Sequence, residues 1–160
     1  MRDLVPLPLP PLVIYRSAVV LWCGKRTPSD GPPVADIAWV YSGDSGDSGE
    51  PLCAPALVGT QVLIDDIDMI DSQNYDVFHS ACSRTLTAPP LVTHEGASLF
   101  LSAWWQSGPR MWWAGLLRIV DDPAISPRRP RVVGRRVPAA EVQRLDGQDY
   151  RPVPRLRASA

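Results

Sequence analysis

The chain has 160 residues, of which 45% are hydrophobic and 21% charged, and this composition excludes a disordered, collagen-like or disulfide-framework protein. The formal net charge of −1 hides an uneven distribution, because residues 1–122 carry 7 Lys and Arg against 14 Asp and Glu, whereas residues 123–160 carry 9 Arg against 3 acidic residues. The near-neutral total therefore does not exclude an anionic partner, since a basic segment can act by itself.

The N-terminal half of the chain is predicted to begin with an arm and continue in strands. Residues 1–11 contain four prolines, which lack an amide donor and favour extended backbone, so they predict a Pro-rich arm. Residues 12–22 are rich in β-branched and aromatic side chains, which is typical of one long strand or two short ones. Residues 34–42 alternate between apolar and polar side chains and predict a half-buried strand.

The clearest predicted tertiary feature is a β-hairpin at 97–120. Two apolar runs flank the five residues QSGPR, whose Gly and Pro suit a hairpin loop. Cross-strand pairing would bring a Trp of the first run near a Trp of the second. Because side chains alternate along a strand, one ring of each Trp pair faces outward. The candidate interface residues are Trp104, Trp105, Trp112 and Trp113.

Beyond residue 122 the composition changes to Arg and Pro. Within this part, residues 138–146 begin with a Pro suited to a first helical turn and are followed by a Gly, so they predict a short helix. No internal repeat at a solenoid period is evident. The predicted fold is mainly β, sandwich or barrel-like, over 12–122, with extended arms at 1–11 and 123–160 and one short C-terminal helix.

The Arg-rich extension is the strongest functional signal. Guanidinium groups bind phosphates bidentately, and basic arms bind nucleic acid by neutralising its backbone. The Val residues between the arginines also suit docking onto protein. Three partners therefore stay open: the acidic body of the same chain, a neighbouring subunit, or a nucleic acid. The candidate binding residues are Arg128, Arg129, Arg131, Arg135, Arg136, Arg151, Arg155 and Arg157.

Two sets of side chains could hold a metal. Three thiols and an imidazole are suitable ligands for tetrahedral zinc, although only one pair has a short spacing and buried thiols are also ordinary core residues. This set is Cys23, Cys53, His79 and Cys82. A group of carboxylates near an imidazole could serve a metal-assisted hydrolase, and it consists of Asp65, Asp66, Asp68 and His79. No other cofactor is predicted.

These features favour a non-enzymatic structural or accessory assembly protein whose arms contact neighbouring subunits, including other copies of the chain. Arg outnumbers Lys 15 to 1, which suggests a GC-rich genome and suits a phage or viral component. A nucleic-acid-binding accessory factor is the first alternative and a metal-assisted hydrolase the second. With no signal peptide and no apolar run of membrane-spanning length, we expect a cytoplasmic or viral-particle location and no membrane partner.

Overall fold

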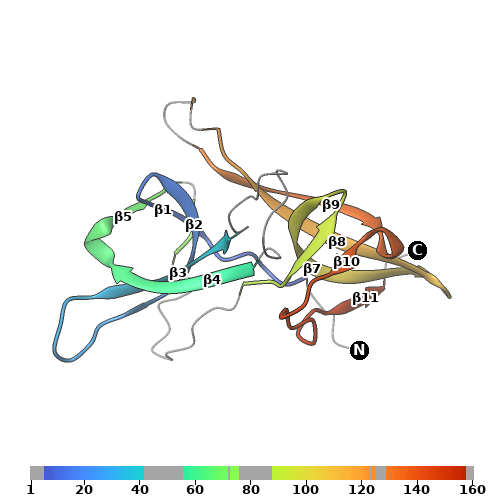
Figure 1. The fold of residues 1–160 in the computed structure, drawn as a ribbon, viewed down its shortest axis with the longest axis horizontal. Helices are drawn as coiled ribbons and strands as arrows, with labels where there is room; N and C mark the ends of the chain where they lie inside the picture. The colour runs from blue at the N-terminus through green and yellow to red at the C-terminus, as the bar shows by residue number, and fades with distance from the viewer. Residues whose placement is uncertain are drawn as a thin grey trace, which may run out of the picture.

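Most of the chain is described by the computed structural model, which covers residues 6–41, 56–71, 73–75, 88–122, 124 and 129–157. Within these ranges the protein is mainly β, as the sequence predicts, and its strands form two sheets (Figure 1). Helical structure in the same ranges is limited to two 3-10 turns. None of the described helical segments is long and apolar enough to cross a membrane.

The first sheet has the strand order β4-β3-β2-β1-β5, and neighbouring strands are antiparallel. The predicted strand region 12–22 is divided into two strands by a tight turn at Arg16 and Ser17, whose φ angles are 49° and 67°. The elements are β1 (Leu12–Tyr15), β2 (Ala18–Arg26), β3 (Val34–Tyr41), β4 (Ala56–Leu63), the 3-10 turn η1 (Ile64–Asp66) and β5 (Ile67–Met69).

The second sheet has the order β10-β6-β7-β8-β9, and β11 adds to β7 in the parallel direction. The predicted Trp hairpin is confirmed, because β7 and β8 pair and place Trp105 opposite Trp113. The elements are β6 (Leu91–His94), β7 (Ala97–Gly108), β8 (Met111–Val120), β9 (Arg131–Pro138), the 3-10 turn η3 (Ala139–Glu141), β10 (Gln143–Arg144) and β11 (Arg155–Arg157).

The short helix predicted near 138–146 is not formed. Only the three residues of η3 are helical, and β10 follows and pairs with β6 through Gln143 and Thr93. Pro138 has an extended backbone and no side chain caps the turn, while Val142 packs on the core of the second sheet. A segment this short has little intrinsic helical stability, so strand pairing and core contacts decide its structure.

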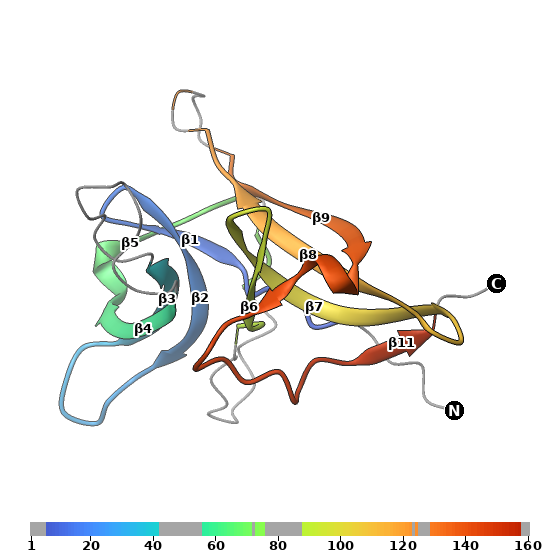
Figure 2. The ribbon, with the colours of Figure 1, turned by 45° about the vertical axis from the view of Figure 1, so that its right-hand side comes forward.

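The described parts of both predicted arms lie against the same chain. At the N-terminus, the Leu7 amide donates to the Ser102 carbonyl at 2.9 Å, and Pro10 is fully buried. At the C-terminus, β9, β10 and β11 all belong to the second sheet, and Figure 2 shows β11 running beside β7. The Arg-rich segment therefore meets its own body over its described residues.

The two sheets repeat one architecture. In each, a short hairpin leads into two longer antiparallel strands, and the chain then returns through a 3-10 turn to a brief strand that pairs with the first one. Both sheets also have a register shift at the same place in their second strand, between Trp22 and Gly24 and between Leu101 and Ala103. We call residues 6–75 the first half and residues 88–157 the second half.

Matching hydrogen bonds support this duplication. In each half, a Tyr hydroxyl accepts from the backbone amide five residues earlier and donates to the carbonyl of the first residue of the first strand. A Gln two residues before that Tyr accepts from the amide of the same first residue, at 3.0 Å in both halves. The residues involved are Leu12, Ile70, Gln73 and Tyr75 in the first half and Leu91, Leu145, Gln148 and Tyr150 in the second.

Short sequence matches accompany the structural repeat. The string PPLV occurs at 10–13 and again at 89–92, and each copy leads into the first strand of its half. An apolar residue followed by D-x-Q-x-Y occurs at 70–75 and again at 145–150. Each copy supplies the Gln and Tyr of the hydrogen bonds that occur in both halves. The chain is therefore an internal duplication with diverged halves.

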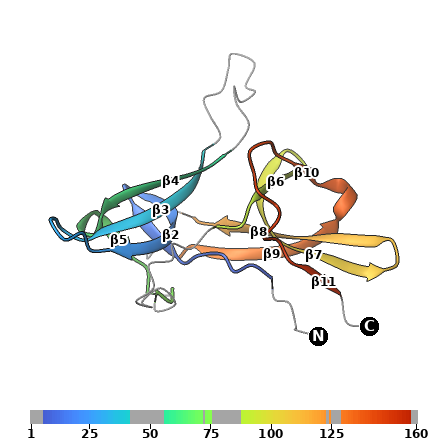
Figure 3. The ribbon, with the colours of Figure 1, turned by 90° about the horizontal axis from the view of Figure 1, so that it is seen from below.

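Each half has its own core, and a third cluster joins them. Val13, Val20 and Ile37 pack inside the first half, while their counterparts Val92, Leu99 and Leu116 pack inside the second. The joining cluster contains equivalent residues of both halves, namely Leu12 with Leu91, Leu21 with Phe100 and Ile70 with Leu145. The halves thus meet through equivalent faces, side by side in Figure 3, as subunits do in an isologous dimer.

Candidate functional site

The Trp hairpin of the second half presents aromatic rings on both of its faces. Trp104 and Trp112 lie on the face that carries the core of this half, and Trp104 is largely buried there. Trp105 and Trp113 are directly paired across the strands and, by alternation, lie on the opposite face. Each Trp pair thus divides between the two faces, as the sequence predicts.

A groove of about 370 Å³ lies on the first of these faces. The Arg144 guanidinium lies 5.3 Å from the centroid of the Trp104 ring and 5.4 Å from that of Tyr150. The Arg155 guanidinium lies 5.9 Å from the centroid of the Trp112 ring. All of these separations are within the range of cation–π attraction. The residues that line the groove, which we call the Arg–Trp groove, are Trp104, Trp112, Ala139, Val142, Arg144 and Arg155.

The opposite face carries a tighter pair. The Arg136 guanidinium lies 3.8 Å from the centroid of the Trp105 ring, and the indole of Trp113 donates to the Ser107 hydroxyl at 2.8 Å. Arg136 is opposite Gly115 in the register of β9 with β8, so the missing side chain leaves space for the Trp105 ring. Arginine therefore contacts tryptophan on both faces of the hairpin. On the core-bearing face the contacts line a groove, and on the opposite face Arg136 and Trp105 form a stacked pair.

The first half builds the same architecture without these side chains. The register places Lys25 where the second half has Trp104, Met69 where it has Arg144, and Gln61 where it has Arg136. The equivalent positions of the first half therefore hold other side chains, and these arginines and tryptophans are specific to the second half.

The halves also differ in charge. The first half contains 3 Lys and Arg against 9 Asp and Glu, whereas the second contains 11 Arg against 6 acidic residues. Their formal charges are −6 and +5, so the two halves have opposite charge, and the excess of basic residues in the second half comes from the part beyond residue 122. The Arg–Trp groove lies in the basic half.

The other predicted arginines are distributed over the second half. Arg129 and Arg131 are exposed, and Arg157 lies beside the tip of the β7–β8 hairpin. Arg151 forms a bidentate pair with Asp149, which lowers the pKa of that carboxyl and raises the pKa of Arg151. Arg128 lies outside the described residues. Of the seven predicted arginines that the structure describes, Arg155 alone lines the groove.

Arg135 forms a polar chain with a buried imidazole. Its guanidinium donates to His94 Nδ1 at 2.8 Å, and His94 Nε2 lies 3.3 Å from a carboxylate oxygen of Glu141. His94 is 3% exposed, so both of its nitrogens are satisfied by protein groups. This chain stabilises the second half and is separate from the groove.

Arg144 and Tyr150 were missed by the sequence analysis. Arg144 falls in the segment predicted to be a helix, and Tyr150 lies beyond it in a stretch predicted to be extended. The repeated D-x-Q-x-Y string is the signal that could have placed Tyr150, because it marks the same position in each half.

The predicted metal ligands are not brought together within the described residues. Cys23 is buried, and burial together with the nearby Asp36 carboxylate raises its thiol pKa to about 11. The carboxylates Asp65, Asp66 and Asp68 are exposed on η1 and β5. Cys53, His79 and Cys82 lie outside the described ranges. No group of three metal-ligating side chains occurs in the part of the chain that is described.

Comparison of the chain with protein families, with curated proteins and with solved structures gives no match.

Proposed function

We propose that the protein is a non-enzymatic binding protein that holds single-stranded nucleic acid in the Arg–Trp groove. The observation that carries this proposal is the placement of Arg144 and Arg155 over indole rings in a groove whose lining contains no acidic residue. The core cluster of the second half backs the groove, because Trp104 belongs to it and Trp112, Ala139 and Val142 pack against it. Core packing therefore holds the groove's aromatic side chains in place.

The two residue types match the two parts of a nucleotide. The indole of Trp112, which is only partly buried, offers a flat apolar face on which a base can stack, and a stacked base contributes about 1–3 kcal/mol. A guanidinium offers paired donors to a phosphate. Bases of a duplex are already stacked and paired, so a concave aromatic groove selects unpaired bases.

The charge difference between the halves supports the same partner. A half with a formal charge of +5 attracts a polyanion, and the half with −6 repels it, so the strand would be directed to the groove side. At physiological ionic strength this guidance acts over roughly 8 Å, which favours contacts close to the second half.

The proposal is tested by measuring the binding of a fluorescent 12-nucleotide oligothymidylate by anisotropy at two salt concentrations. The double variant Arg144→Met and Arg155→Gln should weaken binding at least about ten-fold and reduce the magnitude of the salt slope by about 1.4, since about 0.7 is lost per phosphate contact. Arg144→Met copies the residue at the same place in the first half, so folding should be retained.

Lys25→Met in the first half is the control, because it removes a positive charge outside the groove, at the place equivalent to Trp104, against two removed by the double variant. Its affinity should stay within about two-fold of the wild type, since it lies outside the groove. Equal binding by the wild type and the double variant, or binding that does not weaken with salt, would contradict the proposal.

Contact with a neighbouring protein subunit is a second candidate function. β9 is an edge strand, and its side chains Val132 and Val133 are 40% and 37% exposed. Exposed edges with apolar side chains pair with strands of other chains. Light scattering after size-exclusion chromatography tests this candidate. If the wild type assembles and Val133→Lys is a monomer, the result supports contact through β9. If both proteins are monomers, self-assembly through β9 is excluded.

A further inference from the structure

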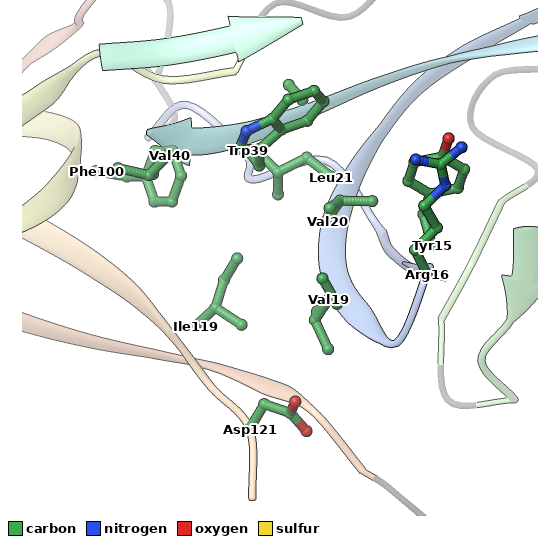
Figure 4. A pocket seen from close by; sticks show the side chains of 12 residues that line it. Tyr15, Arg16, Val19, Val20, Leu21, Trp39, Val40, Phe100, Ile119 and Asp121 are labelled. Atoms are coloured by element: carbon green, nitrogen blue, oxygen red, sulfur yellow. The ribbon is translucent and has the colours of Figure 1, made fainter. Parts of the chain in front are cut away.

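A cleft of about 580 Å³ lies between parts of the two halves, beside the β1–β2 hairpin and next to their shared apolar cluster (Figure 4). It is larger than the Arg–Trp groove and belongs to a different face of the protein. Its volume lies within the range of small-molecule sites, roughly 300–1,000 Å³. Its lining consists of Tyr15, Arg16, Ala18, Val19, Val20, Leu21, Ala38, Trp39 and Val40 from the first half, and Phe100, Ile119 and Asp121 from the second.

Most of this lining is hydrocarbon. Figure 4 shows Val19 and Leu21 on one side of the space and Ile119 and Phe100 on the other, so an inserted chain would contact both halves. Val19 and Ile119 are only partly buried in the free protein. Covering such side chains with an apolar ligand removes their surface from water and favours binding.

One cation is positioned at the rim of the cleft. Arg16 is exposed, its guanidinium lies 5.2 Å from the centroid of the Tyr15 ring, and no ion pair joins it to any described residue. The acidic member of the lining, Asp121, already has an interaction within the chain. Arg16 is therefore an exposed cation at the rim, and it attracts an anionic group.

The backbone that holds Arg16 is unusual for its residue types. Both Arg16 and Ser17 adopt positive φ in the two-residue turn, where Asn-Gly is the favoured sequence. The equivalent turn of the second half has Glu95 and Gly96, with Gly at the second position. The turn of the first half therefore has a less favourable sequence for its backbone conformation, and it places the Arg16 guanidinium at the cleft.

The duplication provides an internal comparison for this site as well. Glu95 and Ser98 occupy the places in the second half that Arg16 and Val19 occupy in the first. The fold therefore tolerates an acid and a small polar residue at these two positions. The cation and the added methyl groups are features of the first half alone.

We propose that this cleft binds an amphipathic carboxylate, with a single acyl chain between the two halves and its carboxylate on the Arg16 guanidinium. The apolar lining matches the acyl chain of this ligand class, and Arg16, which forms no ion pair with the described residues, matches its carboxylate. The site is independent of nucleic-acid binding, because the two share no lining residue.

Titration of the full chain with saturated carboxylates of eight to twelve carbons, below their micelle concentrations, tests the chain part of the proposal. Trp39 lines the cleft, so its fluorescence reports occupancy and calorimetry provides the stoichiometry. Dodecanoate should bind with one site, and each added CH₂ should tighten binding about two- to four-fold. Absence of saturable binding, or affinity independent of chain length, would overturn the proposal.

Variants that copy the second half test the head-group part. Arg16→Glu should weaken dodecanoate binding at least about three-fold and should favour dodecylammonium instead, as expected for an exposed ion pair. Val19→Ser should weaken both ligands about equally by removing apolar contact. Glu95→Gln, in the equivalent turn of the second half, should leave both affinities unchanged.

Thermal unfolding of each variant, followed by circular dichroism, separates loss of binding from loss of structure. If Arg16→Glu unfolds, Arg16→Gln replaces it, with the same expected direction for dodecanoate. Dodecanoate binding that is unchanged in both folded Arg16 variants would show that the guanidinium does not hold the carboxylate and would overturn the assignment.

Discussion

Arg136 on β9 lies with its guanidinium 3.8 Å from the centroid of the Trp105 ring on β7, across the intervening strand β8. The contact is possible because Gly115 of β8 has no side chain. A Cβ built at Gly115 would lie 2.9 Å from Trp105 Nε1 and 3.1 Å from the Ser102 hydroxyl oxygen. A single glycine thus allows a ring from one strand to meet an arginine two strands away.

Gly115→Ala should therefore displace Trp105 and separate it from Arg136. We expect a loss of about 1–3 kcal/mol in the free energy of unfolding, from overpacking of a well-filled site. Urea unfolding measures the loss, and the tryptophan emission of the folded variant reports the moved ring. Gly31→Ala is the control, since no atom lies within 4 Å of its added Cβ; an equal effect from both variants would contradict the steric explanation.

The two bridging tyrosines should have similar energetic roles. Tyr75→Phe and Tyr150→Phe each leave one backbone amide and one carbonyl without their hydroxyl partner. Burial raises the pKa of Tyr75, which keeps its hydroxyl protonated as a donor. Each substitution should cost about 1–3 kcal/mol of unfolding free energy. Chemical denaturation tests this, and a large loss in one half with none in the other would show that the repeated bonds are not equivalent.

Stability should fall at alkaline pH because of Cys23. Its thiol pKa is about 11 in the folded chain, against an ordinary value of 9.0, so the unfolded chain loses this proton first as the pH rises. The resulting stabilisation is fully present below pH 9 and is lost between pH 9 and 11, by about 2–3 kcal/mol in total. Unfolding free energies of reduced protein across this range provide the measurement.

Cys23→Ser should flatten the alkaline part of that profile, because serine does not ionise there. Ser102 occupies the equivalent place in the second half, so the fold accommodates the substitution. Tyrosine and lysine titrate in the same range, and the difference between the two profiles removes their contribution. Identical profiles for the wild type and Cys23→Ser would refute the assignment to this thiol.

His94 should carry its proton on Nε2. Arginine stays protonated and can only donate, so Arg135 requires Nδ1 to be the acceptor, and Nε2–H then points to Glu141. Nitrogen-15 NMR of the imidazole distinguishes the two tautomers directly. Arg135→Thr, which copies Thr60 of the first half, should release this constraint and allow exchange between tautomers; an Nδ1–H tautomer in the wild type would contradict the hydrogen bond.

Local patterns in the sequence are sufficient for the strands but not for the helix near 138–146. Alternation and β-branched runs depend on neighbouring residues only, and they correctly predict strand structure over 12–22 and the Trp hairpin, but they leave open the turn that divides 12–22 into two strands. The helix prediction fails because β10 pairs with β6, about 50 residues earlier in the chain. Long-range pairing of this kind leaves no local signal.

For the candidate site too, local patterns predict some features, and long-range pairing determines the others. Local sequence patterns predict that the protein is mainly β, that tryptophans meet in a hairpin, and that acidic and basic residues are separated along the chain. The location of the basic segment follows from the folded structure: strand pairing places β9 and β11 beside the Trp hairpin, and the pairing of β10 with β6 places Arg144 near Trp104. The physical reason is that charge and periodicity are properties of a segment, whereas a site is made by hydrogen bonds between segments distant in sequence, and here by two diverged halves that meet through equivalent faces.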